Sequence, residues 1–466
     1  MTSYRISLLI PSTSKNNNWQ SFKDTFINSI LLKSFLETYS KQHEYCFYFG
    51  FDVDDKLYND DQFKKDISDF FLENEINYKI INMVDIAPGH LTKMWNVLFE
   101  NAYDDGNNYF LQCGDDIYFN DVGWVDQCIK ILKVNKDIGV TAPMDIVYAS
   151  PDNRFILTQA FVSRKHMEIF RYFFPAEIKN WCCDDWITEI YRNRNFLYRV
   201  KSTLQNLGGK QRYDISYPKE LKNSLVNRDV GKLDKYKRND KIGIVITTFN
   251  SPEYLKQTFD SLKASELNNK DFNLNVYIII VDDGSTDKET LKLLHEFKLD
   301  GVQFIRTITQ NQNQGVYACL KFGLSILDRI GCDILLNLYS DILVKPNFLT
   351  SLLTIFYEYN PVLLTGYNSV LHTEPFKIYN NACIKRSCGA VNMLFSSKTY
   401  NNIIRAKLID IIFDLKNNII RDKLIDIIFD LKICKEIEEV HCTIPSVIQH
   451  IGLKNDDKIN VFKFIS

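Results

Sequence analysis

The sequence predicts an α/β protein made of two similar halves, each with a mainly parallel β-sheet flanked by helices. Short apolar runs alternate with amphipathic segments along the 466 residues, as they do in βαβ units. Each half opens with such a run, at 6–10 and at 242–246, and then repeats the pattern in the same order. A charged segment without a long apolar run, 215–240, is typical of a linker. The predicted domains are therefore 1–214 and 241–466.

The first half is expected to begin with a strand at 6–10 that ends in Pro11. The amphipathic segment that follows, 22–39, has the spacing of a helix. A second apolar run, 45–51, predicts the next strand. The acids that come directly after this strand are Asp52, Asp54 and Asp55.

The second half follows the same order. Its first strand, 242–246, leads into Thr247 and Asn250, and a helix is predicted at 253–262. The next strand, 276–281, ends in two adjacent carboxylates and a glycine turn. These carboxylates are Asp282 and Asp283.

Two further segments of the second half also carry polar groups. A loop rich in amides, 310–316, contains Gln314 and Gly315 and precedes a predicted helix at 317–327. A buried strand at 334–338 then ends in Tyr339, Ser340 and Asp341. In a parallel sheet the carboxyl ends of the strands form the ligand-binding edge, so these groups are expected to face one ligand. A carboxylate there can hold Mg²⁺ or Mn²⁺ against a diphosphate, because hard cations take oxygen ligands.

This ordered set of motifs resembles the inverting glycosyltransferases of the GT-A fold, especially family 2. The resemblance covers about 241–348. It implies a metal site at Asp341, although Tyr339 stands where the family usually has a first aspartate, and it offers His450 as a late metal ligand. It also implies nucleotide-sugar-binding roles for Thr247, Asn250, Asp282, Asp283, Gln314 and Gly315.

The first half resembles the same fold more weakly. A strand at 109–113 leads into Asp115 and Asp116, which match the family's metal-binding position, and Asn206 stands where the second half has His450. By the same comparison the nucleotide-sugar is expected to contact Pro11, Asp52, Asp54, Asp55, Lys93 and Asn96.

The spacing of these positions is similar in the two halves. From Asp116 to Asn206 is 90 residues, and from Asp341 to His450 is 109. The second interval contains a tandem duplication of 16 residues, 401–416 followed by 417–432, and without one copy the two spacings differ by three residues. The chain is therefore predicted to hold two divergent copies of one GT-A domain.

The family usually places a catalytic base shortly before the late histidine. In the first half Asp184 and Asp185 lie between aromatic residues, where burial would raise a pKa; the alternative is a helix N-terminus that carries acids. In the second half the duplication leaves two candidates. Counting back from the histidine favours Asp430, and counting forward favours Asp414. If only one half is active, the intact base position favours the first half.

The predicted function is transfer of a sugar, with inversion, from a nucleotide-diphosphate donor, expected to be UDP-linked, to a hydroxyl of a glycan, protein or lipid. Mn²⁺ or Mg²⁺ would assist. The alternative is a non-catalytic scaffold that binds carbohydrate or nucleotide-sugar, with one or both sites decayed. A sugar nucleotidyltransferase is disfavoured, because neither half has a GxGxR loop after its first strand.

Composition excludes other partners and predicts a location. The 56 basic and 58 acidic residues nearly balance, which argues against nucleic-acid binding. No apolar run reaches the roughly 18–20 residues of a membrane span, and the first residues read as a strand instead of a signal peptide. The expected location is the cytoplasm, with a viral protein in the host cytoplasm as one alternative.

Overall fold

The protein is described by a computed structural model that covers residues 2–147, 155–208, 212–214, 217–267, 274–368, 373–379, 381–416 and 433–451. These residues divide into two compact units. The first extends to Tyr236 and includes Tyr357–Tyr359, and the second comprises the remaining described residues. Within these ranges, no helix combines the length and apolar character that a membrane span needs.

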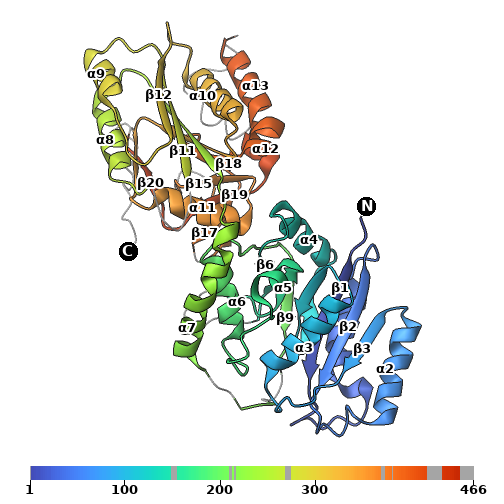
Figure 1. The fold of residues 1–466 in the computed structure, drawn as a ribbon. Helices are drawn as coiled ribbons and strands as arrows, with labels where there is room; N and C mark the ends of the chain where they lie inside the picture. Colours follow the sequence, from blue (N-terminus) through green and yellow to red (C-terminus); the bar gives the residue numbers. More distant parts are fainter. Residues whose placement is uncertain are drawn as a thin grey trace. The chain divides into compact units, whose positions relative to one another are not determined.

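The first unit is built on a six-stranded sheet of order β3-β2-β1-β4-β8-β6 (Figure 1). Strand β1 pairs in parallel with β2 and β4, and β8 runs antiparallel to β4. A smaller sheet has the order β5-β9-β7. The strands are β1 (Arg5–Ser12), β2 (Glu44–Phe51), β3 (Asn77–Ile81), β4 (Tyr109–Gln112), β5 (Ile117–Phe119), β6 (Val140–Thr141), β7 (Met144–Asp145), β8 (Ala160–Ser163) and β9 (Thr203–Asn206).

Helices flank this sheet. Helix α3 packs on β1 and β2, and α2 packs on β3. The helix predicted at 22–39 forms three short pieces, η1, η2 and α1. The helical elements are η1 (Phe22–Asp24), η2 (Ile27–Leu32), α1 (Lys33–Thr38), α2 (Asp61–Glu73), α3 (Leu91–Asp104), α4 (Trp124–Val134), α5 (Lys165–Phe170), α6 (Cys183–Arg192), α7 (Lys219–Val230) and η3 (Gly231–Tyr236).

Residues 217–236 of the charged segment predicted as a linker belong to the first unit. They form α7 and η3, and α7 packs on α6. Leu225, Val226 and Leu233 are buried in the core of the first unit. These three side chains give the segment an apolar face that packs on the core. The many charged residues of the segment make this face hard to recognise in the sequence.

The second unit has a nine-stranded sheet of order β12-β11-β10-β13-β18-β15-β19-β17-β16 and a two-stranded sheet of β14 and β20. Strand β10 pairs in parallel with β11 and β13, and β18 is antiparallel to β13. The strands are β10 (Lys241–Thr248), β11 (Asn275–Asp282), β12 (Phe304–Thr309), β13 (Ile334–Tyr339), β14 (Ile342–Val344), β15 (Leu363–Thr365), β16 (Lys377–Ile378), β17 (Ala382–Lys385), β18 (Asn392–Ser396), β19 (Val440–Thr443) and β20 (Ile448–His450).

Helix α10 packs on β10 and β11 at close range. Gly323 permits this approach, since a Cβ atom there would lie 2.7 Å from Val245. The first copy of the duplication forms η4 and α13, and the second copy, 417–432, lies outside the described residues. The helical elements are α8 (Pro252–Lys263), α9 (Lys288–Glu296), α10 (Val316–Ile330), α11 (Phe348–Tyr359), α12 (Ser397–Thr399), η4 (Tyr400–Ile404), α13 (Arg405–Lys416) and α15 (Lys435–Ile437).

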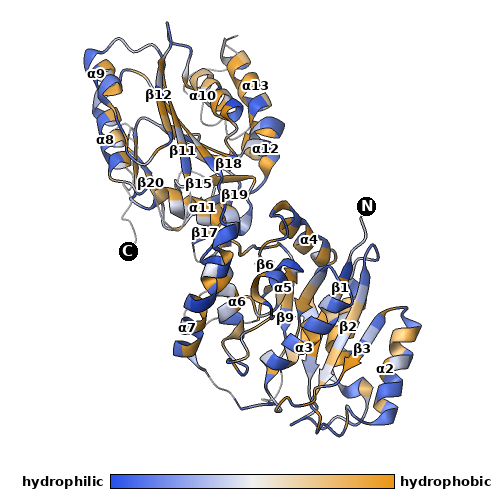
Figure 2. Ribbon diagram, in the orientation of Figure 1, coloured by the Kyte–Doolittle hydropathy of each residue, from blue (hydrophilic) through white to orange (hydrophobic). Residues whose placement is uncertain are grey.

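The predicted α/β fold with parallel-rich sheets is confirmed, and the residue pattern explains it. The central strands are nearly continuous apolar runs, and β10 is buried from its second residue to its end, as expected of a parallel strand covered on both faces. The flanking helices carry both polar and apolar residues (Figure 2).

The two units share one strand order. The series β3-β2-β1-β4-β8-β6 of the first sheet matches β12-β11-β10-β13-β18-β15 of the second. After its fourth listed strand, each unit forms a short strand that pairs antiparallel with a late strand. In this pairing Ile117 lies opposite Asn206, and Ile342 lies opposite His450. The structure therefore places Asn206 and His450 at equivalent positions.

Candidate functional site

The second unit brings Asp341 and His450 together. Asp341 lies in the turn between β13 and β14, and His450 ends β20, the partner strand of β14. His450 Nε2 is 3.0 Å from Asp341 Oδ2. The two residues predicted to share a metal ion are thus in direct contact, although their role as metal ligands stays a prediction.

Two oxygens at this edge of the sheet are buried and have no hydrogen-bond partner among the described residues. They are Oδ1 of Asp341 and Oγ1 of Thr247. Buried polar atoms are seldom left unpaired in native proteins, so an unpaired carboxylate oxygen points to a missing ligand. Carboxylate and imidazole groups are both donors to divalent cations. Asp341 and His450 therefore fit a divalent cation.

Helix α8 fixes the turn that carries Asp341. Thr258 Oγ1, fully buried on α8, lies 2.9 Å from the carbonyl oxygen of Ser340 and 2.8 Å from that of Ile342. It also accepts a hydrogen bond from the backbone N–H of Ile342, at 3.2 Å. The backbone of the turn that carries the Asp341 carboxylate is therefore held by α8, the helix that follows the first strand of the unit.

The loop after β11 is held by Asp282 and Asn250. Asp282 is fully buried and accepts hydrogen bonds from the backbone N–H and the hydroxyl of Ser285. Asn250 Oδ1 accepts from the backbone N–H groups of Thr286 and Asp287, at 2.9 and 3.0 Å. Both predicted nucleotide-binding residues thus shape the loop, and any contact with a nucleotide stays a prediction.

Asp283 holds the start of α10. Its two carboxylate oxygens accept hydrogen bonds from the backbone N–H groups of Gln314, at 2.6 Å, and Gly315, at 2.9 Å. Gly315 has φ +87° and ψ 152°, a backbone conformation that residues with a Cβ atom rarely adopt. The predicted residues at 283, 314 and 315 are therefore in contact, through backbone amides.

Of the two base candidates of the second unit, Asp414 lies among the described residues. Asp414 is near the end of α13, which packs on α10 and η4. Asp430 lies outside the described residues. The start of this helical segment is fixed by Asn401, whose amide donates to Asp328 near the end of α10.

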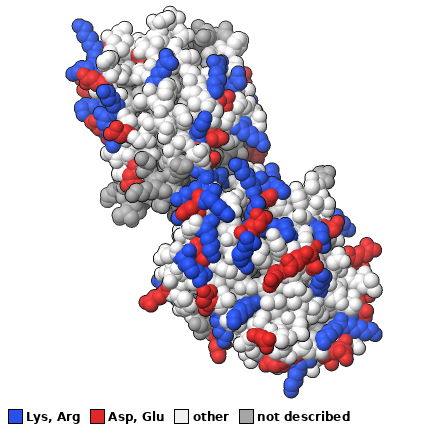
Figure 3. Space-filling model, in the orientation of Figure 1, with Lys and Arg blue, Asp and Glu red and all other residues white. Residues whose placement is uncertain are grey.

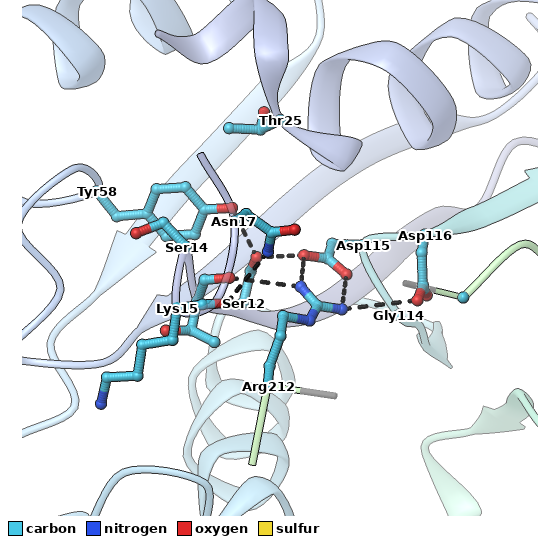
Figure 4. Close-up of polar contacts among 12 residues, drawn as sticks. Ser12, Ser14, Lys15, Asn17, Thr25, Tyr58, Gly114, Asp115, Asp116 and Arg212 are labelled. Carbon is cyan, nitrogen blue, oxygen red and sulfur yellow. Dashed lines mark hydrogen bonds and ion pairs between the residues drawn. The ribbon is translucent and has the colours of Figure 1, made fainter. Parts of the chain in front are cut away.

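In the first unit an arginine occupies the predicted metal site (Figure 4). The guanidinium of Arg212 donates to both oxygens of Asp115, at 2.5 and 2.6 Å, and its Nη2 is 3.6 Å from Asp116 Oδ2. Ser12 Oγ, at the end of β1, lies 2.5 Å from Asp115 Oδ2. Burial and the neighbouring carboxylate of Asp115 raise the pKa of Asp116 to about 6. Asn206 Oδ1 accepts a hydrogen bond from the backbone N–H of Gly208, at 3.1 Å.

The three acids after β2 have different surroundings. Asp55 is buried and accepts from Thr13 and Ser14, so it fixes the loop after β1. Burial raises the pKa of Asp52, whose Oδ2 is 3.5 Å from Lys15 Nζ. The third, Asp54, is exposed and pairs with the same lysine at 3.0 Å.

The remaining nucleotide-binding residues predicted in the first unit serve the fold or face solvent. Pro11 lies within β1, opposite Gly50 of β2. Asn96 lies inside α3, and its amide binds the backbone of Phe173 and Phe174 through three hydrogen bonds. Lys93, earlier on α3, is exposed. Both Lys93 and Asn96 lie in α3, and the described hydrogen bonds of Asn96 go to the loop after α5.

Asp184 and Asp185 lie at a helix N-terminus, and their role as a catalytic base stays a prediction. They lie in the first turn of α6, as acids at a helix N-terminus do. Burial, with smaller contributions from the carboxylates of Asp185 and Asp145, also raises the pKa of Asp184 to about 7. Such a carboxyl group can exchange a proton near neutral pH.

Several residues of the first site were missed by the sequence analysis. They are Ser12, Lys15, Asp145 and Arg212. Arg212 is 97 residues from Asp115 in sequence, and no motif surrounds it. The only signal was general: a buried pair of carboxylates needs a cation nearby.

A comparison with protein families finds a match in the second unit. Residues 243–413 match the family model of glycosyl transferase family 2. No curated protein sequence matches the chain. Among solved structures, S. aureus TarS 1–349 is 17% identical over 43% of this chain and 57% of its own, with a TM-score of 0.30.

A second structure of that fragment, in complex with UDP-GlcNAc, is 16% identical over 43% of this chain and 55% of its own, also with a TM-score of 0.30. The matched region spans less than two thirds of each of these TarS structures. Apart from Tyr357–Tyr359, the matched residues belong to the second unit; they include Asp282, Asp283 and Asp341 and end before His450. The second unit therefore contains a region that matches glycosyl transferase family 2, and it has the parallel-rich α/β sheet described above.

Proposed function

We propose that the chain is a glycosyltransferase whose second unit transfers a sugar from a nucleotide-diphosphate donor to an acceptor hydroxyl. The observation that carries the proposal is the contact of Asp341 with His450 beside an unpaired carboxylate oxygen. It lies at the strand ends of the unit that matches family 2. This is the edge at which parallel α/β sheets bind ligands.

The nucleotide part of the donor would contact the loops after β10 and β11. We propose that this nucleotide is UDP. Asp282 and Asp283 are buried acceptors at the end of β11, and the loop that Asp283 holds begins α10 with Gly315. Backbone N–H groups at a helix N-terminus favour a negatively charged ligand. The other residues that we propose to contact the nucleotide are Thr247, Asn250 and Gln314.

Asp341 and His450 would hold the divalent cation, Mn²⁺ or Mg²⁺. When bound, such a cation stabilises the negative charge that develops on the departing diphosphate. Among the described residues, no group of three or more histidine, cysteine, aspartate or glutamate side chains is arranged as a metal site. The remaining ligands are therefore proposed to come from the donor itself and from water.

The acceptor hydroxyl attacks the anomeric carbon while the bond from that carbon to the diphosphate oxygen breaks on the opposite face. This in-line displacement inverts the configuration. The hydroxyl proton passes to a carboxylate as the new bond forms, and we propose Asp430 for this role, with Asp414 as the alternative. The acceptor class, a glycan, protein or lipid, stays open.

The first unit is proposed to be a related copy. Leu207 N–H donates to the carbonyl of Asp116 at 3.1 Å, and Ile451 N–H donates to that of Asp341 at 2.8 Å, so the two turns share their backbone contacts. The intact base position favoured the first unit as the active one. The family match and the ion pair of Arg212 favour the second, with the first as a scaffold.

The surface fits the proposed kind of partner. Lysine, arginine, aspartate and glutamate side chains are interspersed on each unit over the face drawn (Figure 3). An acceptor that is a nucleic acid would call for a continuous basic surface. We therefore keep a glycan, protein or lipid as the proposed acceptor. We also keep the cytoplasm as the proposed site of action.

The test is an assay of the purified chain with a panel of nucleotide-sugars and Mn²⁺, in which released nucleotide is measured. We expect Asp341→Asn to lower the rate at least 100-fold, the effect of losing about 3 kcal/mol of transition-state stabilisation. Asp260→Asn is the matched control, because Asp260 is exposed on α8 and pairs with Lys256. Equal rates for the two variants would contradict the proposal.

A further inference from the structure

The carboxylates of the first unit that resemble a metal site are already paired with a cation of the chain. Arg212 binds Asp115 through two hydrogen bonds, a geometry in which the planar guanidinium matches both carboxylate oxygens. The side chains of this pair are 16% and 1% exposed. Because the pair is largely withdrawn from water, it is screened much less than a surface ion pair.

Both oxygens of Asp115, which a divalent cation at this place would need, already have hydrogen-bond partners. Asp115 Oδ2 accepts from Arg212 and lies 2.5 Å from Ser12 Oγ, while Oδ1 accepts from the second guanidinium nitrogen. Asp116 Oδ2 is 3.6 Å from the same nitrogen. A divalent ion at this place would also lie against a fixed positive charge. The residues of the first unit therefore do not fit a divalent cation.

The equivalent turn of the second unit carries a different set of contacts. Asp341 corresponds to Asp116 in the strand order, and it has a buried Oδ1 without a partner among the described residues. Its other oxygen contacts the imidazole of His450. The turn of the first unit is thus paired with an arginine, whereas the turn of the second unit has a carboxylate oxygen that can bind a ligand.

Neighbouring contacts anchor the segment that carries Arg212. The hydroxyl of Tyr213 donates to Asp52 Oδ2 at 3.4 Å, and the Tyr213 ring lies against Gly89. The carbonyl of Asp214 accepts from the amide of Asn180 at 3.0 Å. Residues 212–214 therefore cover both the acid pair after β4 and a predicted nucleotide-binding acid after β2.

We propose that Arg212 is the resident cation of the first unit, where it takes the place of a divalent ion at Asp115 and Asp116. The first unit then binds no Mn²⁺ or Mg²⁺ at these residues. Any metal requirement of the chain comes from the second unit alone. The inference stands on the first unit's own contacts and does not depend on sugar transfer.

The test is Mn²⁺ binding to the full chain, followed by the electron paramagnetic resonance signal of free Mn²⁺. The background is Asp341→Asn, which removes the proposed site of the second unit. In that background we expect Arg212→Gln to gain one bound Mn²⁺ per chain, and Arg212→Lys to gain none, because lysine restores the positive charge. The gain should vanish again when Asp116→Asn is added.

Two results would overturn the inference: a properly folded Arg212→Gln chain without the added Mn²⁺, or a loss of Mn²⁺ when Asp115→Asn alone is introduced into the otherwise unchanged chain. The second measurement leaves Arg212 in place, so it decides the matter even if the glutamine variant does not fold. Loss of Mn²⁺ with Asp341→Asn reports separately on the proposed function.

Discussion

His450 Nε2 lies 3.0 Å from Asp341 Oδ2, although 109 residues separate the two along the chain. The pairing of β14 with β20 creates this contact, because it sets His450 directly opposite Ile342, the residue after Asp341. If both residues are metal ligands, as the family resemblance implies, their side chains must lie within about 4–5 Å of each other. Their contact is what makes the second unit the better candidate for metal-assisted transfer.

The first prediction concerns His450. His450→Ala removes one of two proposed ligands, so we expect Mn²⁺-dependent UDP binding to weaken about 10- to 100-fold, the effect of losing one charge-assisted contact. Calorimetry with UDP, with and without Mn²⁺, measures this. Binding without Mn²⁺ should not change, and an equal loss in both titrations would show that His450 serves the fold instead.

The second prediction concerns Asp283. Asp283→Ala leaves the backbone N–H groups of Gln314 and Gly315 without their acceptor, so we expect the free energy of unfolding to fall by about 2 kcal/mol. UDP binding should weaken about tenfold or more. Asp287→Ala is the comparison: it removes the N-cap of α9, at about 1 kcal/mol, and should affect UDP less. Unchanged UDP affinity in a folded Asp283→Ala chain would move the nucleotide elsewhere.

The third prediction compares the glycines at the two ends of α10. Gly315→Ala forces a residue with a Cβ atom into φ +87° and ψ 152°, and we expect a loss of about 1–3 kcal/mol. Gly331→Ala, at φ +81° and ψ 38°, should cost about 1–2 kcal/mol. A Cβ atom meets nothing within 4 Å at either site, so both costs come from the backbone. Donor binding should fall only for Gly315→Ala, because this loop contacts Asp283.

The fourth prediction uses the buried His166 of the first unit. Burial lowers its pKa to about 4 from 6.5. Between these values the unfolded chain binds a proton that the folded chain does not, so stability falls as the pH drops below about 6.5, by about 2 kcal/mol at pH 5. His166→Gln should reduce this dependence. Urea unfolding of both chains at pH 7 and pH 5 checks it, and equal slopes would contradict it.

Much of the fold could be predicted from local pattern. The apolar runs that predict strands at 242–246 and 276–281 form β10 and β11, and the amphipathic segment at 317–327 forms α10. Strand and helix periodicity depends on neighbours in sequence, so it is visible in one chain. The linker was less predictable, because Leu225, Val226 and Leu233 become core residues only when α7 packs on α6.

The candidate site, too, has features that the sequence predicts and features that depend on the tertiary structure. Sequence by itself determined that acids follow the strands, that their order repeats, and that Asn206 and His450 take equivalent places. Tertiary structure alone decided which partner each acid has. Asp283 binds the amides of residues 314 and 315, while Asn96 binds the backbone of the loop after α5.

The sharpest case is Asp115, which resembles a metal ligand in sequence but is paired with Arg212 in the structure. The partner comes from a segment that returns past the end of β4 after β9, 97 residues later. A carboxylate has the same local sequence whether a metal ion or an arginine neutralises it. The choice depends on which cation the folded chain brings within about 3 Å, and no periodicity in the sequence encodes that distance.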